Sequence, residues 1–176
     1  MKTPMVTVLA LVIGIAIGYG IHWFTKGATS IKNDTPAQVE QESNRVNGIG
    51  GIFFKTEDPN RLKQWYSKHL GLNVDDYGTN FEWRHASDST QKGFTLWAPF
   101  SSKSTYFDGP LMINYRVSDL DGLLEKLKEE GVTVVDVMEP VEYGKFAHIL
   151  DIDGNKVELW ESYDDKYDEI VDGRTR

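Results

Sequence analysis

Two stretches of the chain read as β-strands. GIFFKTED at 51–58 opens with an apolar run, MINYRVSD at 112–119 alternates apolar and polar residues, and each ends in an aspartate that can cap a following helix. Two further strand-like stretches resemble one another, FTLW at 94–97 and VELW at 157–160. The pattern therefore predicts two units that each open and close on a strand.

Helical spacing of apolar residues follows each opening strand. One stripe of Leu, Trp and Tyr runs through residues 62–70, and a stripe of leucines runs through 120–127. A glycine follows each stripe, at Gly71 and at Gly131, where it can adopt the left-handed conformation that ends many helices. Cap, stripe, glycine and closing strand recur in the same order. The chain is therefore predicted to contain an internal repeat of about sixty residues, with strand, helix and several strands in each copy.

The segment YGKFAHILDIDGNKVELWE, residues 143–161, carries the best candidate for chemistry. Two alternating runs flank the sequence DIDGN, which predicts a β-hairpin because Gly154 and Asn155 tolerate the positive φ of tight turns. If the two strands pair symmetrically about the turn, His148 faces Glu158 on the same side of the hairpin. The pair could serve as an acid and a base, since a carboxylate orients a neighbouring imidazole and raises its pKa. An ordinary cross-strand ion pair is the alternative.

The first 24 residues are interpreted as a membrane anchor or a signal peptide. Residues 6–24 are apolar over a length that can span a bilayer core of roughly 30 Å. Bulky aromatics at the end of the run favour an uncleaved single-pass anchor, with the rest of the chain on the extracytoplasmic side. After cleavage the protein would instead be secreted or periplasmic. Gly14 and Gly18 have a spacing that could let two such helices pack as a homodimer, although glycine is common in membrane helices.

The remaining chain divides into a linker, one domain and a tail. Residues 25–47 are polar without an apolar period and predict a flexible linker. The domain covers residues 48–162, with modules at about 48–100 and 111–161. Residues 163–176 are strongly acidic and are expected to form a solvated end.

Composition narrows the possible partners. The formal net charge is −8 and no basic patch is present, which argues against a nucleic-acid partner. The chain has no cysteine, so disulfides and thiolate chemistry are excluded. Five Trp, eight Tyr and eight Phe residues can supply a substantial core.

The repeat, together with IFFKTEDPNRLKQWYSKHLGL and DIDGNKVELWE, resembles the vicinal oxygen chelate superfamily, the glyoxalase, bleomycin-resistance and extradiol dioxygenase group. The resemblance covers about residues 48–162. It implies an α+β fold of two tandem βαβββ modules that form a curved mixed sheet around a cleft. It leaves the activity open, because this superfamily includes lyases, epimerases, dioxygenases, thiol transferases and non-catalytic binders.

The resemblance also implies where a divalent metal would be bound. The corresponding positions in this sequence are Gly51, Thr95, Met112 and Glu158. Of these only Glu158 is a good ligand, since glycine has no side chain, a thioether suits soft ions and a threonine hydroxyl binds weakly. A catalytic metal needs about three protein ligands. We therefore expect no standard metal site, with Glu158 as the one retained ligand.

Strand alternation predicts which side chains face the cleft. With Glu158 facing inward, the expected ligand-binding residues are Phe53, Lys55, Asn114, Arg116 and Trp160. Tyr143 could lie in a loop over the cleft, and Tyr106 in the connection between modules is assigned to the core. Lys55 and Arg116 would suit an anionic ligand; alternatively, they pair with carboxylates at the end of their strands.

Three functions are compatible with this sequence. The first is binding of a small anionic or oxygenated molecule without a metal. The second is an enzyme of the same superfamily that uses His148 and Glu158, either a lyase or isomerase similar to lactoylglutathione lyase or a dioxygenase, with any metal completed by other residues. The third is a membrane-displayed domain that binds a partner and whose cleft is vestigial.

Overall fold

The computed structural model describes residues 45–174. The predicted membrane segment at 6–24 and nearly all of the predicted linker lie outside these residues. Within the described part of the chain, no helix is long and apolar enough to cross a membrane.

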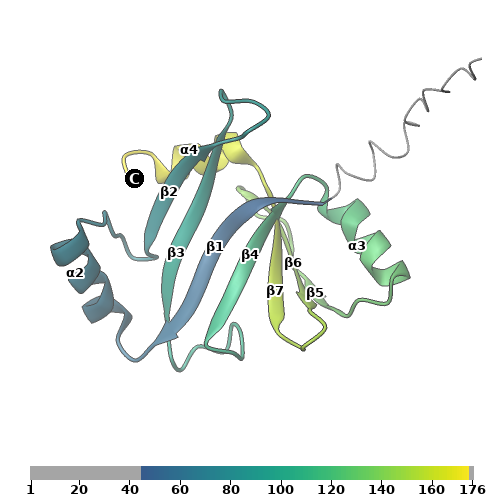
Figure 1. Cartoon of the computed structure of the whole chain (residues 1–176), viewed down its shortest axis with the longest axis horizontal. Helices are drawn as coiled ribbons and strands as arrows, with labels where there is room; N and C mark the ends of the chain where they lie inside the picture. Colours follow the sequence, from purple (N-terminus) through teal and green to yellow (C-terminus); the bar gives the residue numbers. More distant parts are fainter. Residues whose placement is uncertain (1–44, 175–176) are drawn as a thin grey trace, which may run out of the picture. The chain divides into compact units, whose positions relative to one another are not determined.

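Within residues 45–174, seven strands form one mixed sheet in the order β2-β3-β1-β4-β7-β6-β5, and three helices accompany it (Figure 1). The strands are β1 (Val46–Thr56), β2 (Thr79–Arg84), β3 (Lys92–Ser101), β4 (Leu111–Val117), β5 (Val134–Val137), β6 (Gly144–Leu150) and β7 (Lys156–Ser162). The helices are α2 (Pro59–Leu70), α3 (Leu120–Glu129) and α4 (Asp164–Val171).

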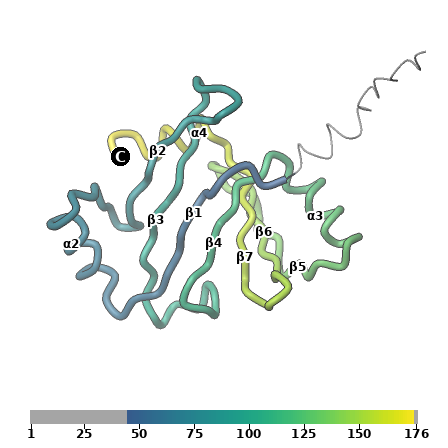
Figure 2. The backbone as a smooth tube through the Cα atoms, viewed as in Figure 1, coloured from purple at the N-terminus to yellow at the C-terminus, as the bar shows by residue number. Residues whose placement is uncertain are grey.

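The predicted internal repeat is confirmed by the strand pairing. β1 runs parallel to β3, and β4 runs parallel to β7 in the same way. β1 and β4 pair antiparallel at the centre of the sheet and so join the two units. Figure 2 follows the chain from one half of the sheet to the other, with α2 beside the first half and α3 beside the second. The α+β fold with a mixed sheet is thus as expected.

Both repeat helices begin and end as the sequence predicts. The Asp58 carboxylate accepts a hydrogen bond from the backbone N–H of Arg61 at the start of α2, and the Asp119 carboxylate caps α3 in the same way. The glycines that follow the helices have φ angles of 70° at Gly71 and 81° at Gly131, which is the left-handed region. Local chemistry therefore sets the bounds of these helices.

The two modules are unequal, which corrects the prediction of two βαβββ units. The second module has three strands after its helix, but the first has only β2 and β3. Residues 71–78, between α2 and β2, form no strand: the Asp75 carboxylate accepts from the N–H groups of Tyr77 and Gly78. Lys63 donates from α2 to backbone carbonyls of the same segment. Side chains thus satisfy backbone groups that a strand would have paired.

The acidic segment after β7 is not a solvated end, so that expectation was wrong. Residues 164–171 form α4, in which Tyr167 and Val171 are buried. These two side chains pack with Phe94 and Trp160. The i, i+4 spacing of Tyr167 and Val171 places them on one face of the helix, with the acidic residues around it.

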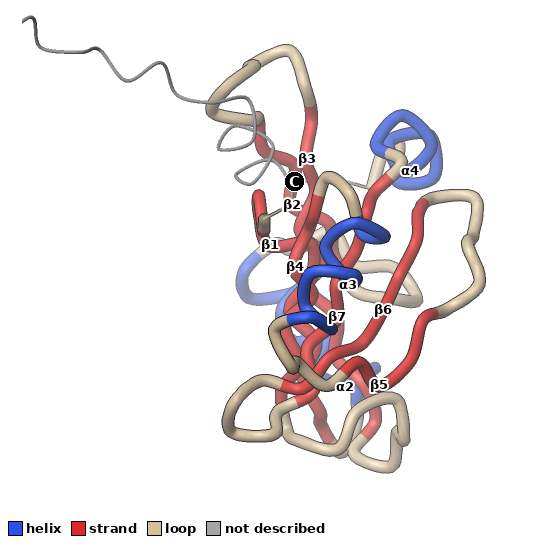
Figure 3. Tube along the Cα trace, turned by 90° about the vertical axis from the view of Figure 1, so that its right-hand side faces the viewer, coloured by secondary structure: helices blue, strands red, loops and turns tan. Residues whose placement is uncertain are grey.

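The two faces of the sheet carry separate cores. One face packs against α3 through Val117, Leu120, Leu123, Leu124, Ala147 and Leu159. Figure 3 shows α3 beside the edge formed by β5 and β6. Two clusters form on the other face: one contains Phe53, Ala98 and Met112 of the strands with Phe107 of the connection before β4, and the other contains Phe94 and Trp160 of the strands with Tyr167 and Val171 of α4. As strand alternation predicts, Glu158 and Trp160 lie on one face of the sheet and Leu159 lies on the other.

Candidate functional site

A cavity of about 440 Å³ lies on the face of the sheet opposite α3, between its two aromatic clusters. Eight aromatic side chains line it: Phe53, Tyr77, Phe100, Tyr106, Tyr143, Phe146, Trp160 and Tyr167. Leu96, Ala98, Met138 and Val141 add further apolar surface. Polar lining comes mainly from Asn114 and Glu158 on the central strands and from Asp76. The cavity has the size and the apolar character of a small-molecule site.

His148 and Glu158 face one another as predicted. β6 and β7 pair in the register that joins these two residues, and the turn uses Gly154 at a φ of 80° while Asn155 takes no positive φ. The Nε2 atom of His148 lies 3.0 Å from Oε1 of Glu158, and both side chains are only 2% exposed. On its other side, His148 Nδ1 lies 2.6 Å from Oδ1 of Asp136 on β5. The imidazole is therefore held between two carboxylates.

Two further side chains hold the Glu158 carboxylate. The Tyr106 hydroxyl donates to Oε1, and Nδ2 of Asn114 donates to Oε2 at 2.5 Å. Asn114 lies directly opposite Glu158 across the parallel pair β4–β7, so the sheet register brings them together. A side chain at Gly50 would collide with this arrangement, because a Cβ there would lie 2.2 Å from Asn114 Oδ1. The carboxylate is thus fixed at the base of the cavity.

The surroundings of His148 favour its protonated form. Burial lowers the pKa of this imidazole, but its hydrogen bonds to Glu158 and Asp136 outweigh burial, and the pKa is raised above its usual value. Burial, together with the negative charge of Glu158, strongly raises the pKa of the Tyr106 hydroxyl. Tyr106 is therefore a hydrogen-bond donor at neutral pH rather than a base.

The predicted cations do not reach the cavity. Arg116 lies on the expected face, but its Nη2 pairs with Oδ1 of Asp164 at 2.5 Å, and the guanidinium lies over the rings of Trp83 and Trp160. Lys55 points toward the carbonyl of Asp108, near the end of its strand. Neither residue is among those that line the cavity. Arg116 therefore pairs with a carboxylate, which was the alternative interpretation of its role.

The other three predicted ligand-binding residues do reach the cavity. Phe53, Asn114 and Trp160 all line the cavity together with Glu158. His148 does not, because it lies behind Glu158. Tyr143 lines the cavity as expected, and its backbone carbonyl accepts a hydrogen bond from the indole of Trp160. Strand alternation therefore predicted the correct face of the sheet. Which side chains on that face reach the cavity depends on the contacts that each of them makes.

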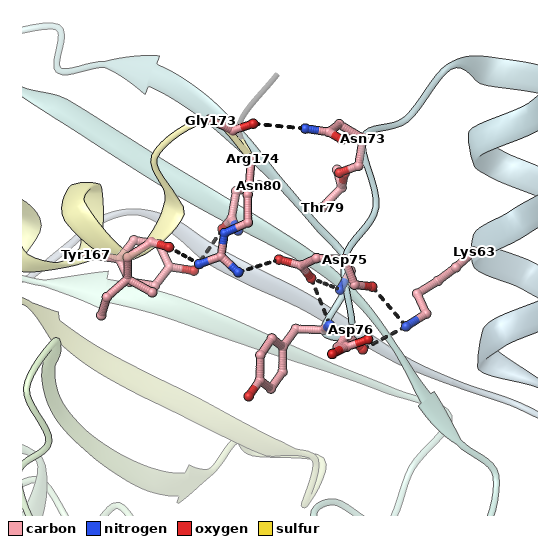
Figure 4. A network of polar contacts seen from close by, with 12 residues as sticks. Lys63, Asn73, Asp75, Asp76, Thr79, Asn80, Tyr167, Gly173 and Arg174 are labelled. Atoms are coloured by element: carbon pink, nitrogen blue, oxygen red, sulfur yellow. Dashed lines mark hydrogen bonds and ion pairs between the residues drawn. The ribbon is translucent and has the colours of Figure 1, made fainter.

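The C-terminal helix closes one side of this site through Tyr167. The Tyr167 ring packs edge-on against Trp160, and its hydroxyl donates to Oδ1 of Asn80 on β2. Figure 4 shows how the chain after α4 is attached to the turn that precedes β2: Arg174 pairs with Asp75 at 2.9 Å, and the carbonyl of Gly173 accepts from Asn73. These contacts join the chain's last described residues to the first module.

Three residues of the site were missed by the sequence reasoning. Tyr106 was assigned to the core, Asp136 was not considered, and Tyr167 fell in the segment expected to be solvated. The apolar spacing of Tyr167, Ile170 and Val171 is a signal that could have found α4. No comparable local signal exists for Tyr106, which lies 52 residues from the carboxylate it contacts.

The donor set does not fit the metal site of the resembled superfamily. Glu158 reaches the cavity, but Met112 is buried in an apolar cluster and Gly51 has no side chain. The Thr95 hydroxyl donates to the Ile49 carbonyl and accepts from Trp83. Across residues 45–174, no three His, Cys, Asp or Glu side chains converge in a way that could hold a metal ion.

Residues 45–159 match the Glyoxalase/Bleomycin resistance protein/Dioxygenase superfamily. The chain belongs to this superfamily. The match ends within β7, so α4 and its contacts with the cavity lie beyond the matched residues.

Several solved structures share the fold. A variant of the Streptomyces coelicolor methylmalonyl-CoA epimerase in complex with 2-nitronate-propionyl-CoA has 16% identity and a TM-score of 0.52, covering 68% of this chain and 99% of its own. A methylmalonyl-CoA epimerase with methylmalonyl-CoA and NH4+ has 15% identity and a TM-score of 0.52, covering 68% of this chain and 96% of its own. No curated protein matches the chain.

Proposed function

We propose that this domain binds a small molecule with an apolar body and one polar group, without a transition metal. The observation that carries the proposal is the position of Glu158. Its carboxylate is fixed by Tyr106, Asn114 and His148 at the base of a cavity whose walls are largely aromatic. Aromatic walls provide buried area for an apolar body, and a fixed polar group orients the ligand.

The lining argues against the anionic ligand that the sequence suggested. Among the described residues that line the cavity there is no Lys or Arg, while Glu158 contributes a buried carboxylate. An anionic group placed there would lose its hydration without a compensating charge. The ligand's polar group is therefore neutral or positively charged.

A titration of the full-length chain with 1-naphthylmethanol tests this proposal. This neutral probe is smaller than the cavity, and saturable binding in NMR spectra is expected at millimolar probe concentration. Val141→Trp narrows the site at a lining residue that is already 37% exposed, and should weaken binding at least about tenfold. Val135→Trp on β5 is the control, because that exposed valine does not line the cavity.

Three results would contradict the proposal. Equal binding by the two tryptophan variants would show that the probe is not in this cavity. Stoichiometric, tightly held transition metal in the purified protein would contradict binding without a metal. If no saturable binding occurs, the third hypothesis, a partner-binding domain with a vestigial cleft, becomes the better account.

Proton transfer is a second candidate function, favoured by the series Asp136, His148 and Glu158. A carboxylate in a cavity, backed by an imidazole and a second carboxylate, can take a proton from carbon and pass it on. Because no Lys or Arg is among the described residues that line the cavity, a neutral carbon acid such as 2-acetylnaphthalene in D2O is a suitable first substrate. Deuterium incorporation above the uncatalysed rate should be lost in Glu158→Gln. Equal incorporation by that variant would remove Glu158 from the mechanism.

A further inference from the structure

The hydrogen-bonding groups at the base of the cavity identify the polar end of the ligand. We propose that it is a protonated amine, so that the domain binds organic ammonium compounds with an aromatic or alkyl body. This inference rests on the proposed function and specifies its ligand class. Three features support it: open acceptor positions, the placement of the nearby cations, and the aromatic walls.

Free hydrogen-bonding capacity at the base of the cavity is of the acceptor kind. A carboxylate offers about four lone-pair positions, and Glu158 uses three of them for Tyr106, Asn114 and His148. Oδ1 of Asn114 is buried and has no hydrogen-bond partner among the described residues. It lies against Gly50, which itself lines the cavity. Because Gly50 covers Asn114 Oδ1, a ligand N–H donor would use the remaining acceptor position on Glu158.

The cations near the site are engaged elsewhere. Arg116 pairs with Asp164, beneath α4. Lys156 donates to the backbone carbonyl of Tyr106 and lies 3.9 Å from Asp136, and it does not line the cavity. With His148 protonated, the charges of Lys156, Asp136, His148 and Glu158 balance. An ammonium group would therefore be selected by the acceptors at the base of the cavity.

The walls suit a cation better than an anion. The face of an aromatic ring carries partial negative charge, which attracts an ammonium group within about 6 Å and repels a carboxylate. Phe146 is stacked on Trp160 with centroids 5.6 Å apart and Arg116 also lies over Trp160, so a cation–π contact with the ligand falls to the other aromatic residues of the lining. Cation–π attraction and the carboxylate of Glu158 thus favour the same sign of ligand charge.

Three naphthalene probes that differ in one polar group test the inference on the full-length chain. These are 1-naphthylmethylamine, 1-naphthylmethanol and 1-naphthoate, titrated at pH 7 by calorimetry or NMR. The amine should bind at least about tenfold more tightly than the carboxylate, with the alcohol between them. Glu158→Gln should weaken the amine about tenfold and change the alcohol much less. Glu125→Gln, the same chemical change on an exposed position of α3, should leave all three unchanged.

The outcomes separate this inference from the function on which it rests. If 1-naphthoate binds as tightly as the amine, or if Glu158→Gln weakens all three probes equally, the ammonium assignment is overturned while binding in the cavity stands. If no probe binds, the proposed function fails, and the inference with it. Preferential binding of the amine that is lost in Glu158→Gln supports both.

Discussion

The Nε2 atom of His148 lies 3.0 Å from Oε1 of Glu158, and neither side chain is more than 2% exposed. On the far side of the imidazole lies Asp136, whose side chain is 45% exposed. The imidazole therefore links a carboxylate in the cavity to one at the protein surface. A proton that His148 gains or loses changes the charge next to the cavity.

The pairing of His148 should make folding stability depend on pH. Because the pKa of His148 is raised in the folded protein, its protonation stabilises the fold fully below the unfolded value of about 6.5. That contribution is lost as the pH rises through the folded value. In urea unfolding, the difference between the wild type and His148→Gln should therefore be largest near pH 5.5 and shrink toward pH 9. A difference that grows with pH would contradict the assignment, as would an NMR titration that gives His148 a pKa below 6.5.

Tyr106→Phe should destabilise the protein by about 1–3 kcal/mol, the cost of removing a hydrogen bond to a buried charged group. The change removes only the hydroxyl that donates to Glu158. Tyr115→Phe is the matched control, since the Tyr115 hydroxyl makes no hydrogen bond with residues 45–174 and its ring packs on the α3 side of the sheet. Urea unfolding measures both variants. Equal losses would mean that the Tyr106 hydroxyl is not specifically engaged.

Tyr167→Ala should cost about 3–5 kcal/mol, as expected for removing a large buried aromatic side chain. The loss arises because Phe94 and Trp160 would lose a packing partner and Asn80 its donor. Tyr163→Ala, just before α4, provides the comparison because that tyrosine is 38% exposed. Similar stability for the two variants would argue that α4 is not part of the folded unit.

Asp164→Ala should destabilise the protein by about 1–3 kcal/mol, because it leaves the buried Arg116 without its carboxylate. Nε and Nη1 of Arg116 already lack partners among the described residues, which increases its dependence on Asp164. Asp165→Ala removes a neighbouring, exposed carboxylate and should have little effect. The double variant Arg116→Met/Asp164→Ala should be at least as stable as Asp164→Ala alone. A further loss in the double variant would show that Arg116 stabilises the fold independently of Asp164.

The parts of this fold that local chemistry determines could be predicted from sequence. Asp58 and Asp119 cap their helices, and the hairpin turn sets the register that joins His148 to Glu158. Each of these features depends on residues within about ten positions of one another. The repeat then followed from the recurrence of the same local signals.

Features set by distant contacts could not be predicted. Alternation placed Arg116 on the correct face, but its direction depends on Asp164, which belongs to a helix that the acidic composition obscured. The contact between Tyr106 and Glu158 depends on how the connection between modules folds back on the sheet. The first module lacks a third strand after its helix because Asp75 forms a turn there. Asp75 also pairs with Arg174, which lies 99 residues away in the sequence.

The most direct test of the central claim is to locate a bound probe by NMR. With 1-naphthylmethanol at saturation, intermolecular NOEs should connect the naphthalene protons to the methyl groups of Leu96 and Ala98, which line the cavity. No NOEs are expected to Leu123 or Leu124, which pack between α3 and the opposite face of the sheet. NOEs to those α3 leucines in place of Leu96 and Ala98 would contradict the assignment of the binding site.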